Sequence, residues 1–192
     1  WMLVDTLMGG NDVIREQGKK YLPKFHDESE KGYNNRLIRS YLFAGYSNTI
    51  ERHAGKPFSV PVKVEGLTDV RLESIESDVN LEAQNITSFS KALFKDAENH
   101  GMSFTLVDMP SSGADGSVQG DIDNNIRPKF IHIPAPCLYY WDDAVIENKR
   151  QLTEIIYKDD YRRYRWTRET WQVYKQANED ESRLFAESVG NR

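Results

Sequence analysis

The residues best suited to chemistry in this 192-residue sequence form the run YRRYRW at positions 161–166. Its arginines could neutralise phosphates and its aromatic rings could stack on bases, so the run is a candidate nucleic-acid contact. Arginine, tyrosine and tryptophan also dominate the binding energy of many protein interfaces. If the run is a strand, Arg163 and Arg165 share one face, and pairing with nearby carboxylates in a sheet would explain them equally well. The other face would carry Arg162, Tyr164 and Trp166.

A second candidate is an acidic residue at a strand end, Asp108 in the sequence LVDMP. With the Gly-, Ser- and Asp-rich stretch 111–127 it could hold a metal ion, which would make the chain a metal-dependent enzyme. The aspartates of that stretch lack EF-hand spacing, and no glutamate closes them. We therefore favour a turn or helix-capping role for Asp108 and a solvated, mobile loop at 111–127. The aspartates concerned are Asp115, Asp121 and Asp123.

The other residue types that support catalysis are scattered along the chain. No two histidines have the i, i+4 spacing that puts two metal ligands on one helix face. His53 and His100 each precede a glycine that could end a helix, where a cation complements the helix dipole. The single cysteine, Cys137, excludes an internal disulfide framework and is expected to be buried. Composition and spacing therefore predict no enzymatic activity, no cofactor and no metal site. The remaining histidines are His26 and His132.

The composition is ordinary for a folded protein, with 29% charged and 39% hydrophobic residues. A net charge of −5 argues against a protein that coats nucleic acid, although a local basic patch remains possible. No apolar run approaches the ~18 residues of a membrane helix. The chain begins at Trp1 and ends in a polar stretch, which predicts a fragment of a longer protein.

The first hundred residues carry the pattern of helices. The longest predicted helix spans 27–58, with a capping box at Asp27 and Glu30 and a left-handed cap at Gly55. A shorter helical region at 1–18 is expected to break at Gly9-Gly10. A further helix runs from a cap at Asn85 or Thr87 to Gly101, and residues 67–79 form a short amphipathic helix. Alternation at 58–65 predicts one strand, placed at a sheet edge by Pro61.

Beyond residue 103 the apolar period changes to two. Strands are predicted at 102–110 and 129–133, followed by an irregular crossing at 134–141 and a meander over 152–176. This order indicates an α+β fold. The expected parts are a mainly helical part at 1–103, a mainly β part at 104–176 containing the 111–127 loop, and a truncated polar tail at 177–192.

A series of short motifs runs in order through residues 1–145. It comprises Gly9-Gly10, Tyr21-Leu22-Pro23-Lys24, Tyr33 with Arg36, Gly55-Lys56-Pro57-Phe58, Gly101 ahead of Leu106-Val107-Asp108-Met109-Pro110, and Arg127-Pro128 followed by Trp141. The series resembles the N-terminal part of tailed-bacteriophage portal proteins, in a prophage branch catalogued as a domain of unknown function.

The resemblance implies a structural subunit without catalytic residues. Portal proteins form a ring of usually about twelve subunits at one capsid vertex, and DNA is driven through it by the terminase motor. This chain would be a wing-side fragment whose partners are its own copies, the capsid, terminase and the neck or tail proteins. DNA would pass without sequence-specific binding, and no membrane would be involved. The expected location is the virion, and the bacterial cytoplasm during assembly.

Closure of such a ring requires two different faces of each subunit to meet. The hypothesis for those faces is the predicted long helix and the 161–175 meander. Exposed aromatic and arginine side chains are suited to anchor such a contact. The proposed interface residues are Tyr161, Arg163, Arg165, Trp166 and Trp171.

Overall fold

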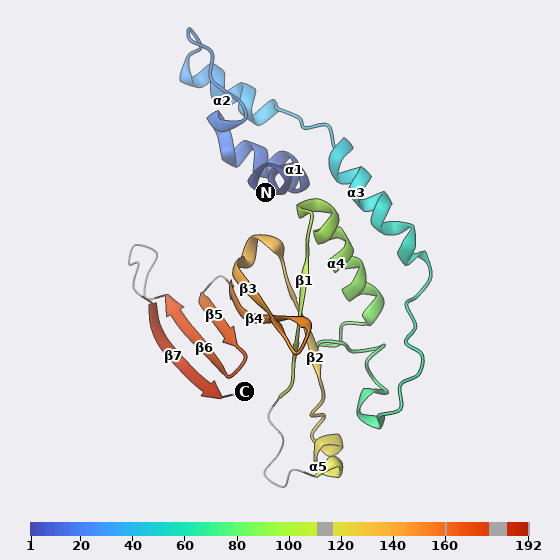
Figure 1. Ribbon diagram of the computed structural model, residues 1–192. Coiled ribbons are helices and arrows are strands. Elements are labelled where there is room, and N and C mark those ends of the chain that lie inside the picture. Colours follow the sequence, from blue (N-terminus) through green and yellow to red (C-terminus); the bar gives the residue numbers. More distant parts are fainter. Residues whose placement is uncertain (111–116, 160, 177–183, 192) are drawn as a thin grey trace. The chain divides into compact units, whose positions relative to one another are not determined.

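The computed structural model describes residues 1–110, 117–159, 161–176 and 184–191. The fold is α+β, with helices in the first half and antiparallel strands in the second (Figure 1). The chain forms two compact units. Unit 1 comprises Trp1–Met102 and Val107–Phe130, and unit 2 comprises Ser103–Leu106 and Ile131–Arg192. Unit 2 begins at the expected boundary near residue 103, but unit 1 also takes residues 107–130 from beyond that boundary.

Helix α1 (Met2–Gln17) contains the break expected at the glycine pair. Gly10 has φ 72° and ψ −147°, a backbone conformation outside the helical region that glycine adopts without strain. Gly18 ends the helix and leads into a single 3₁₀ turn, Gly18–Lys20. α1 is therefore two short helical segments joined at Gly10.

The predicted helix at 27–58 is wrong as a single element: it is two helices, α2 (Glu30–Arg39) and α3 (Gly45–Gly55). Ser40 is extended, with φ −64° and ψ 140°. Its carbonyl accepts from Arg15 Nη2 at 2.8 Å, and the Leu42 amide donates to Asn11 Oδ1 at 2.6 Å. These hydrogen bonds from α1 replace those that a continuous helix would have made across 40–44.

The ends of these helices also differ from the prediction. Ser29, not Asp27, caps α2, and its Oγ accepts from the Gly32 amide at 3.1 Å. Gly55 belongs to the last turn of α3 and is not left-handed. Pro57 still ends the α-helical hydrogen bonding, because it opens a 3₁₀ turn at Pro57–Ser59.

The strand predicted at 58–65 is not formed. After the 3₁₀ turn the chain is extended, but side chains take the place of a neighbouring strand. The Val62 amide donates to Thr87 Oγ1 at 2.9 Å, and the Val64 amide donates to Glu76 Oε1 at 2.7 Å. The predicted helix at 67–79 reduces to a 3₁₀ turn at Val70–Leu72 and further turns.

Helix α4 (Ile86–His100) carries the core of unit 1 and has the predicted ends. Asn85 caps it by accepting from the Ser88 amide at 2.8 Å, and Gly101 closes it with φ 84°. Phe89 lies in a buried cluster with residues from the turns that precede α4 and from the start of β2. That cluster contains Ile75, Val79 and Phe89, with Leu72, Leu93 and Phe130 packed against it.

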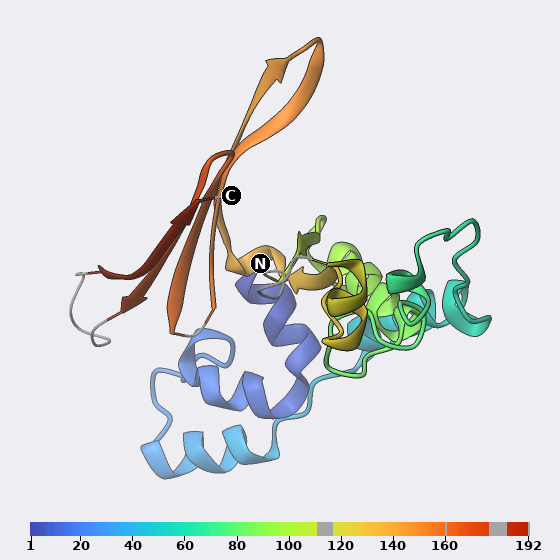
Figure 2. The same cartoon turned by 90° about the horizontal axis from the view of Figure 1, so that it is seen from below.

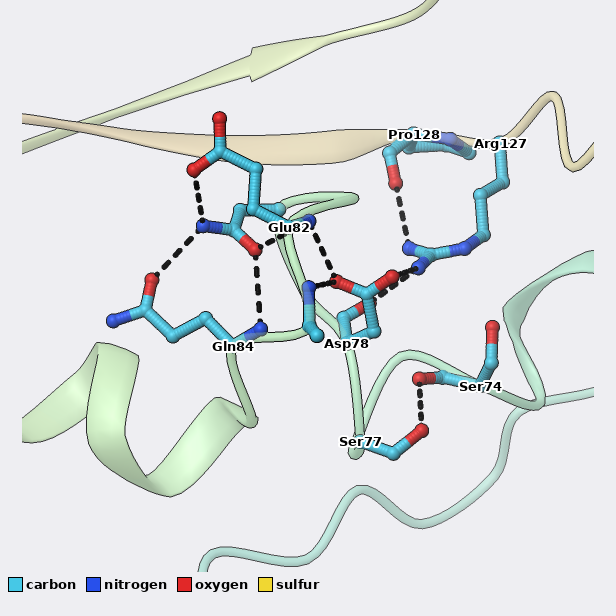
Figure 3. Close-up of polar contacts among 9 residues, drawn as sticks. Ser74, Ser77, Asp78, Glu82, Gln84, Arg127 and Pro128 are labelled. Carbon is cyan, nitrogen blue, oxygen red and sulfur yellow. Dashed lines mark hydrogen bonds and ion pairs between the residues drawn. The ribbon is translucent and has the colours of Figure 1, made fainter.

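A loop at 78–84 is fixed by an arginine from outside it (Figure 3). Arg127 is 2% exposed and donates to Asp78 Oδ2 at 2.9 Å and to the Asp78 carbonyl. The other oxygen of Asp78 accepts from the Glu82 and Ala83 amides, at 3.1 and 3.0 Å. Leu81 and Ala83 have φ of 64° and 62°, so the ion pair between buried Arg127 and half-buried Asp78 holds a strained backbone.

The stretch expected as a mobile loop at 111–127 lies partly outside the described residues. Its described remainder contains a short helix, α5 (Val118–Asp123), with Asp121 buried. Ser117 caps α5 by accepting from the Gly120 amide at 3.0 Å. This segment leads into Arg127. Part of the predicted loop therefore positions the arginine that contacts the 78–84 loop.

Two strands pair with each other before the meander begins. They are β1 (Phe104–Asp108) and β2 (Lys129–Ile133), and both are at the predicted positions. Each strand begins in one unit and ends in the other. A 3₁₀ turn at Ala135–Cys137 follows β2.

The meander of unit 2 is confirmed and is larger than predicted. Its five antiparallel strands follow sequence order: β3 (Leu138–Ile146), β4 (Lys149–Lys158), β5 (Arg162–Thr167), β6 (Thr170–Gln176) and β7 (Leu184–Asn191). The predicted irregular crossing at 134–141 was wrong from Leu138 onward. The described part of the 177–192 tail, residues 184–191, is strand β7, whose backbone pairs with β6.

The first hairpin of this sheet, formed by β3 and β4, extends beyond the neighbouring strand β5 (Figure 2). β5 pairs only with Glu154–Lys158, so the rest of β4 pairs with β3 alone. Glu147 and Asn148 form the turn, with φ of 50° and 61°. Positive φ at both central residues is the type I′ geometry that suits a two-residue hairpin.

Candidate interaction surface

The register of the five-stranded sheet assigns the candidate side chains to two faces. Residues directly opposite each other on neighbouring strands lie on the same face. Ile155 is opposite Trp166, which is opposite Trp171, so these three share the first face. Ile156 is opposite Arg165, and Lys158 is opposite Arg163, so these four share the second face. The run YRRYRW is thus divided as its alternation predicted.

The first face packs against the core of unit 2. Ile133, Leu138 and Tyr157 are buried there, at 2%, 8% and 8% exposure. The Tyr164 ring stacks on Tyr157 with centroids 4.7 Å apart and 11° between the planes. Trp166 packs against the same cluster, and its ring lies 6.4 Å from that of Trp171. Cys137, predicted as buried, is half-buried against this cluster.

The second face, here called the open face, carries cations stacked on a tyrosine. Arg163 lies over the Tyr139 ring, 4.7 Å from its centroid, and Lys158 Nζ lies 5.4 Å from the same centroid. Tyr139 is 54% exposed and its neighbour Tyr140 is 45% exposed. Cation–π pairs of this kind hold the guanidinium in place while leaving it accessible to a partner.

Arg165 completes the open face through an ion pair. Its Nε lies 2.5 Å from Glu154 Oε1 on the neighbouring strand. The hydrogen bond that Arg165 donates to this carboxylate raises the pKa of the guanidinium above its usual value. Arg165 therefore matches the sequence reading in which an arginine of the run pairs with a nearby carboxylate.

Tyr161 lies in the connection between β4 and β5. It is 77% exposed, and its amide donates to Asp159 Oδ1 at 2.8 Å. The same carboxylate accepts from the Arg162 amide at 2.7 Å and from the Tyr164 hydroxyl at 2.7 Å. Burial and then the bond to Asp159 raise the pKa of Tyr164. Burial opposes ionisation of Asp159, but the bonds from Tyr161, Tyr164 and Arg162 lower its pKa.

The proposed interface residues therefore have different surroundings. Tyr161 is exposed in the connection between β4 and β5. Arg163 and Arg165 lie on the open face, where Arg165 forms an ion pair with Glu154. Trp166 and Trp171 lie on the face that packs against the core. Sequence reasoning missed Tyr139, Tyr140 and Lys158, since it assigned 134–141 to an irregular crossing. The aromatic residues at the start of β3, with the Glu147-Asn148 turn after the strand, were the signal that could have found them, because aromatic residues favour strands.

One apolar cavity lies beside the core of unit 2. Its volume is about 160 Å³, and Phe104, Leu106, Ile133, Ile155 and Trp166 line it with shorter polar side chains. Drug-sized ligands occupy pockets of roughly 300–1,000 Å³. The cavity is thus small for a cofactor or a nucleotide.

Asp108, the residue of the alternative metal site, forms an ion pair. Asp108 ends β1, and its Oδ2 lies 3.5 Å from Lys129 Nζ on β2. Among the residues that the structure describes, no three His, Cys, Asp or Glu side chains are placed to hold a metal ion. Asp115 lies outside the described residues. In the same described part of the chain, no helix has the length and apolar character needed to cross a membrane.

Comparisons with known proteins do not assign the chain to a family. No family model matches it, and no match is found among curated proteins.

Proposed function

We propose that this chain is a wing-side part of a phage portal subunit, a structural component of a ring at the capsid vertex. The motif series in residues 1–145 motivates this proposal. The α+β fold and the open face of the sheet support it. The open face carries the proposal furthest, because it displays aromatic and cationic side chains in the combination typical of interface anchors.

The proposed contact is between the open face of one subunit and a different face of the next. Such a heterologous contact closes into a ring when the rotation between neighbours divides a full turn. Tyr139 and Arg163 would be its anchors, since the cation–π pair fixes both side chains before association and less rotamer entropy is lost on binding. Trp166 and Trp171 would support the sheet from its packed face. The neighbouring copy of this chain would supply acidic side chains to face these cations, because its net charge is −5.

The test begins with the mass in solution, by light scattering, of the full-length protein that contains this sequence. A ring near twelve subunits supports the proposal. A monomer at high concentration contradicts it. In that case, salt-dependent retention on DNA, reduced by Arg163→Glu, would favour the alternative of a nucleic-acid-binding module.

The open face is tested by the double variant Tyr139→Ala/Arg163→Glu in that full-length protein. We expect a shift from rings to smaller species, because the variant removes an anchor and reverses a charge. Arg168→Glu is the matched control, since Arg168 is exposed in the turn between β5 and β6 and changes charge equally. Rings formed equally by both variants would remove the open face from the interface.

A further inference from the structure

We propose that His100, in its protonated form, is a pH-sensitive latch that holds the first turns of α1 against the end of α4, with Gly10 as the hinge. The latch lies entirely within unit 1 and does not depend on the proposed portal function.

Two carboxylates at hydrogen-bond distance favour the charged form of the histidine. His100 Nε2 lies 2.7 Å from Asp5 Oδ1, and Nδ1 lies 2.7 Å from Asp96 Oδ1. An ionised carboxylate only accepts hydrogen bonds, and a neutral imidazole can donate from only one nitrogen. Both contacts are satisfied together only by the imidazolium. The His100 and Asp96 side chains are 7% and 10% exposed, so water screens this pair weakly.

Asp5 makes the contact a link between helices. It comes from the first turn of α1, whereas Asp96 lies one turn before His100 on α4. Residue 1 adds two contacts at the same point: the Trp1 indole N–H donates to the His100 carbonyl at 2.8 Å, and its ring meets the imidazole edge-on, at 6.0 Å. Losing the ion pair would loosen the beginning of α1.

The other groups around the latch are polar and belong to α4 and α3. Asn99 Oδ1 accepts from the Tyr46 hydroxyl of α3 at 2.8 Å. Asn99 Nδ2, an N–H donor, lies 3.2 Å from His100 Nε2 and favours the neutral imidazole at that position. His53 Nδ1 lies 2.5 Å from Glu98 Oε1, and Lys95 forms an ion pair with Glu51, so both contacts join α3 to α4. The charged groups that contact the imidazole are thus Asp5 and Asp96, both negative, and both favour the charged form.

Apart from this point, the first turns of α1 are held by the half-buried Val4, Leu7 and Met8 and by Lys20, whose Nζ donates to Met2 Sδ. Trp1, Met2 and Leu3 are 53%, 62% and 54% exposed, and Thr6 is the buried residue of the helix. The break at Gly10 interrupts the helical hydrogen bonds. Residues 2–9 can therefore move without unwinding the second segment of α1.

The sign of the pH effect follows from the surroundings of His100. Burial lowers its pKa, but the hydrogen bonds that the imidazolium donates to Asp5 and Asp96 raise it more, so the folded pKa lies above the usual value near 6.5. A raised folded pKa means that the latch contributes fully below the unfolded pKa and is lost as pH rises through the folded pKa. We expect α1 to be docked below the folded pKa of His100 and released above it.

Hydrogen exchange tests the latch directly in this chain. Protection factors for the amides of residues 2–9, corrected for the intrinsic pH dependence of exchange, should fall as pH rises through the His100 pKa measured by NMR. The total fall should be about tenfold for each unit by which that pKa exceeds the unfolded value. A His100 pKa at or below the unfolded value would overturn the proposal, as would pH-independent protection.

Three variants separate charge from packing. His100→Gln should lower protection of residues 2–9 at acidic pH, whereas His100→Lys should keep it at pH values where the wild type has lost it. Asp5→Asn removes one carboxylate with little change in volume and should lower the His100 pKa. Asp12→Asn is the matched control, because Asp12 is on the second segment of α1 with its side chain 91% exposed. If His100→Lys behaved like His100→Gln, packing rather than charge would hold α1.

Discussion

At the scale of single residues, Arg127 links two segments that lie far apart in the sequence. Its guanidinium is buried and donates to Asp78. Asp78 in turn accepts hydrogen bonds from two backbone amides of the 78–84 loop. The Asp78 side chain is 25% exposed, so removing Arg127 leaves a partly desolvated carboxylate without its cation, which costs more than the pair contributes. The strained φ of Leu81 and Ala83 makes this loop dependent on Asp78 being held.

We predict that Arg127→Ala lowers the free energy of unfolding by about 3 kcal/mol. Chemical denaturation followed by circular dichroism measures this value. Arg168→Ala should stay within about 0.5 kcal/mol of the wild type, because Arg168 is exposed in a turn. Adding Asp78→Asn to Arg127→Ala should recover part of the loss, since the uncompensated charge is then absent. Full additivity of the two changes would show that the ion pair does not couple these segments.

At the scale of elements, the hairpin of β3 and β4 depends on its turn. Glu147 has φ 50°, a conformation in which a residue with a long side chain is disfavoured and asparagine is tolerated. We predict that Glu147→Asn raises the free energy of unfolding by roughly 0.5–1 kcal/mol. Glu147→Ala removes the same charge without favouring positive φ and should give no gain. Equal stabilisation by both variants would attribute the effect to charge.

At the scale of elements, the sequence predicted the helices and strands that local signals mark and missed those that depend on distant contacts. Asn85 and Gly101 mark the ends of α4, and the period of two marks β4 to β6, because caps and alternation are local signals. Ser40 breaks the 27–58 helix through bonds to Asn11 and Arg15, which no local pattern shows. The open face was half predicted: Arg163 and Arg165 were recognised, but Tyr139 depended on strand pairing twenty or so residues away.

At the scale of the whole molecule, two separate cores stabilise the two units. Phe89 belongs to the core of unit 1 and Leu138 to that of unit 2. β1 and β2 connect the units, since each strand has residues in both. The question is whether the chain unfolds as one cooperative body or whether each unit loses its structure by itself.

We predict independent loss of structure. Phe89→Ala should cost about 3–5 kcal/mol, because it leaves a cavity in a site that is 3% exposed. Hydrogen exchange should then show lost protection in α4, while the amides of β4 and β5 keep theirs, since their bonds depend on the other core. Leu138→Ala should produce the reverse pattern. If either variant removed protection from both units, the pairing of β1 with β2 would couple the two cores into a single cooperative unit.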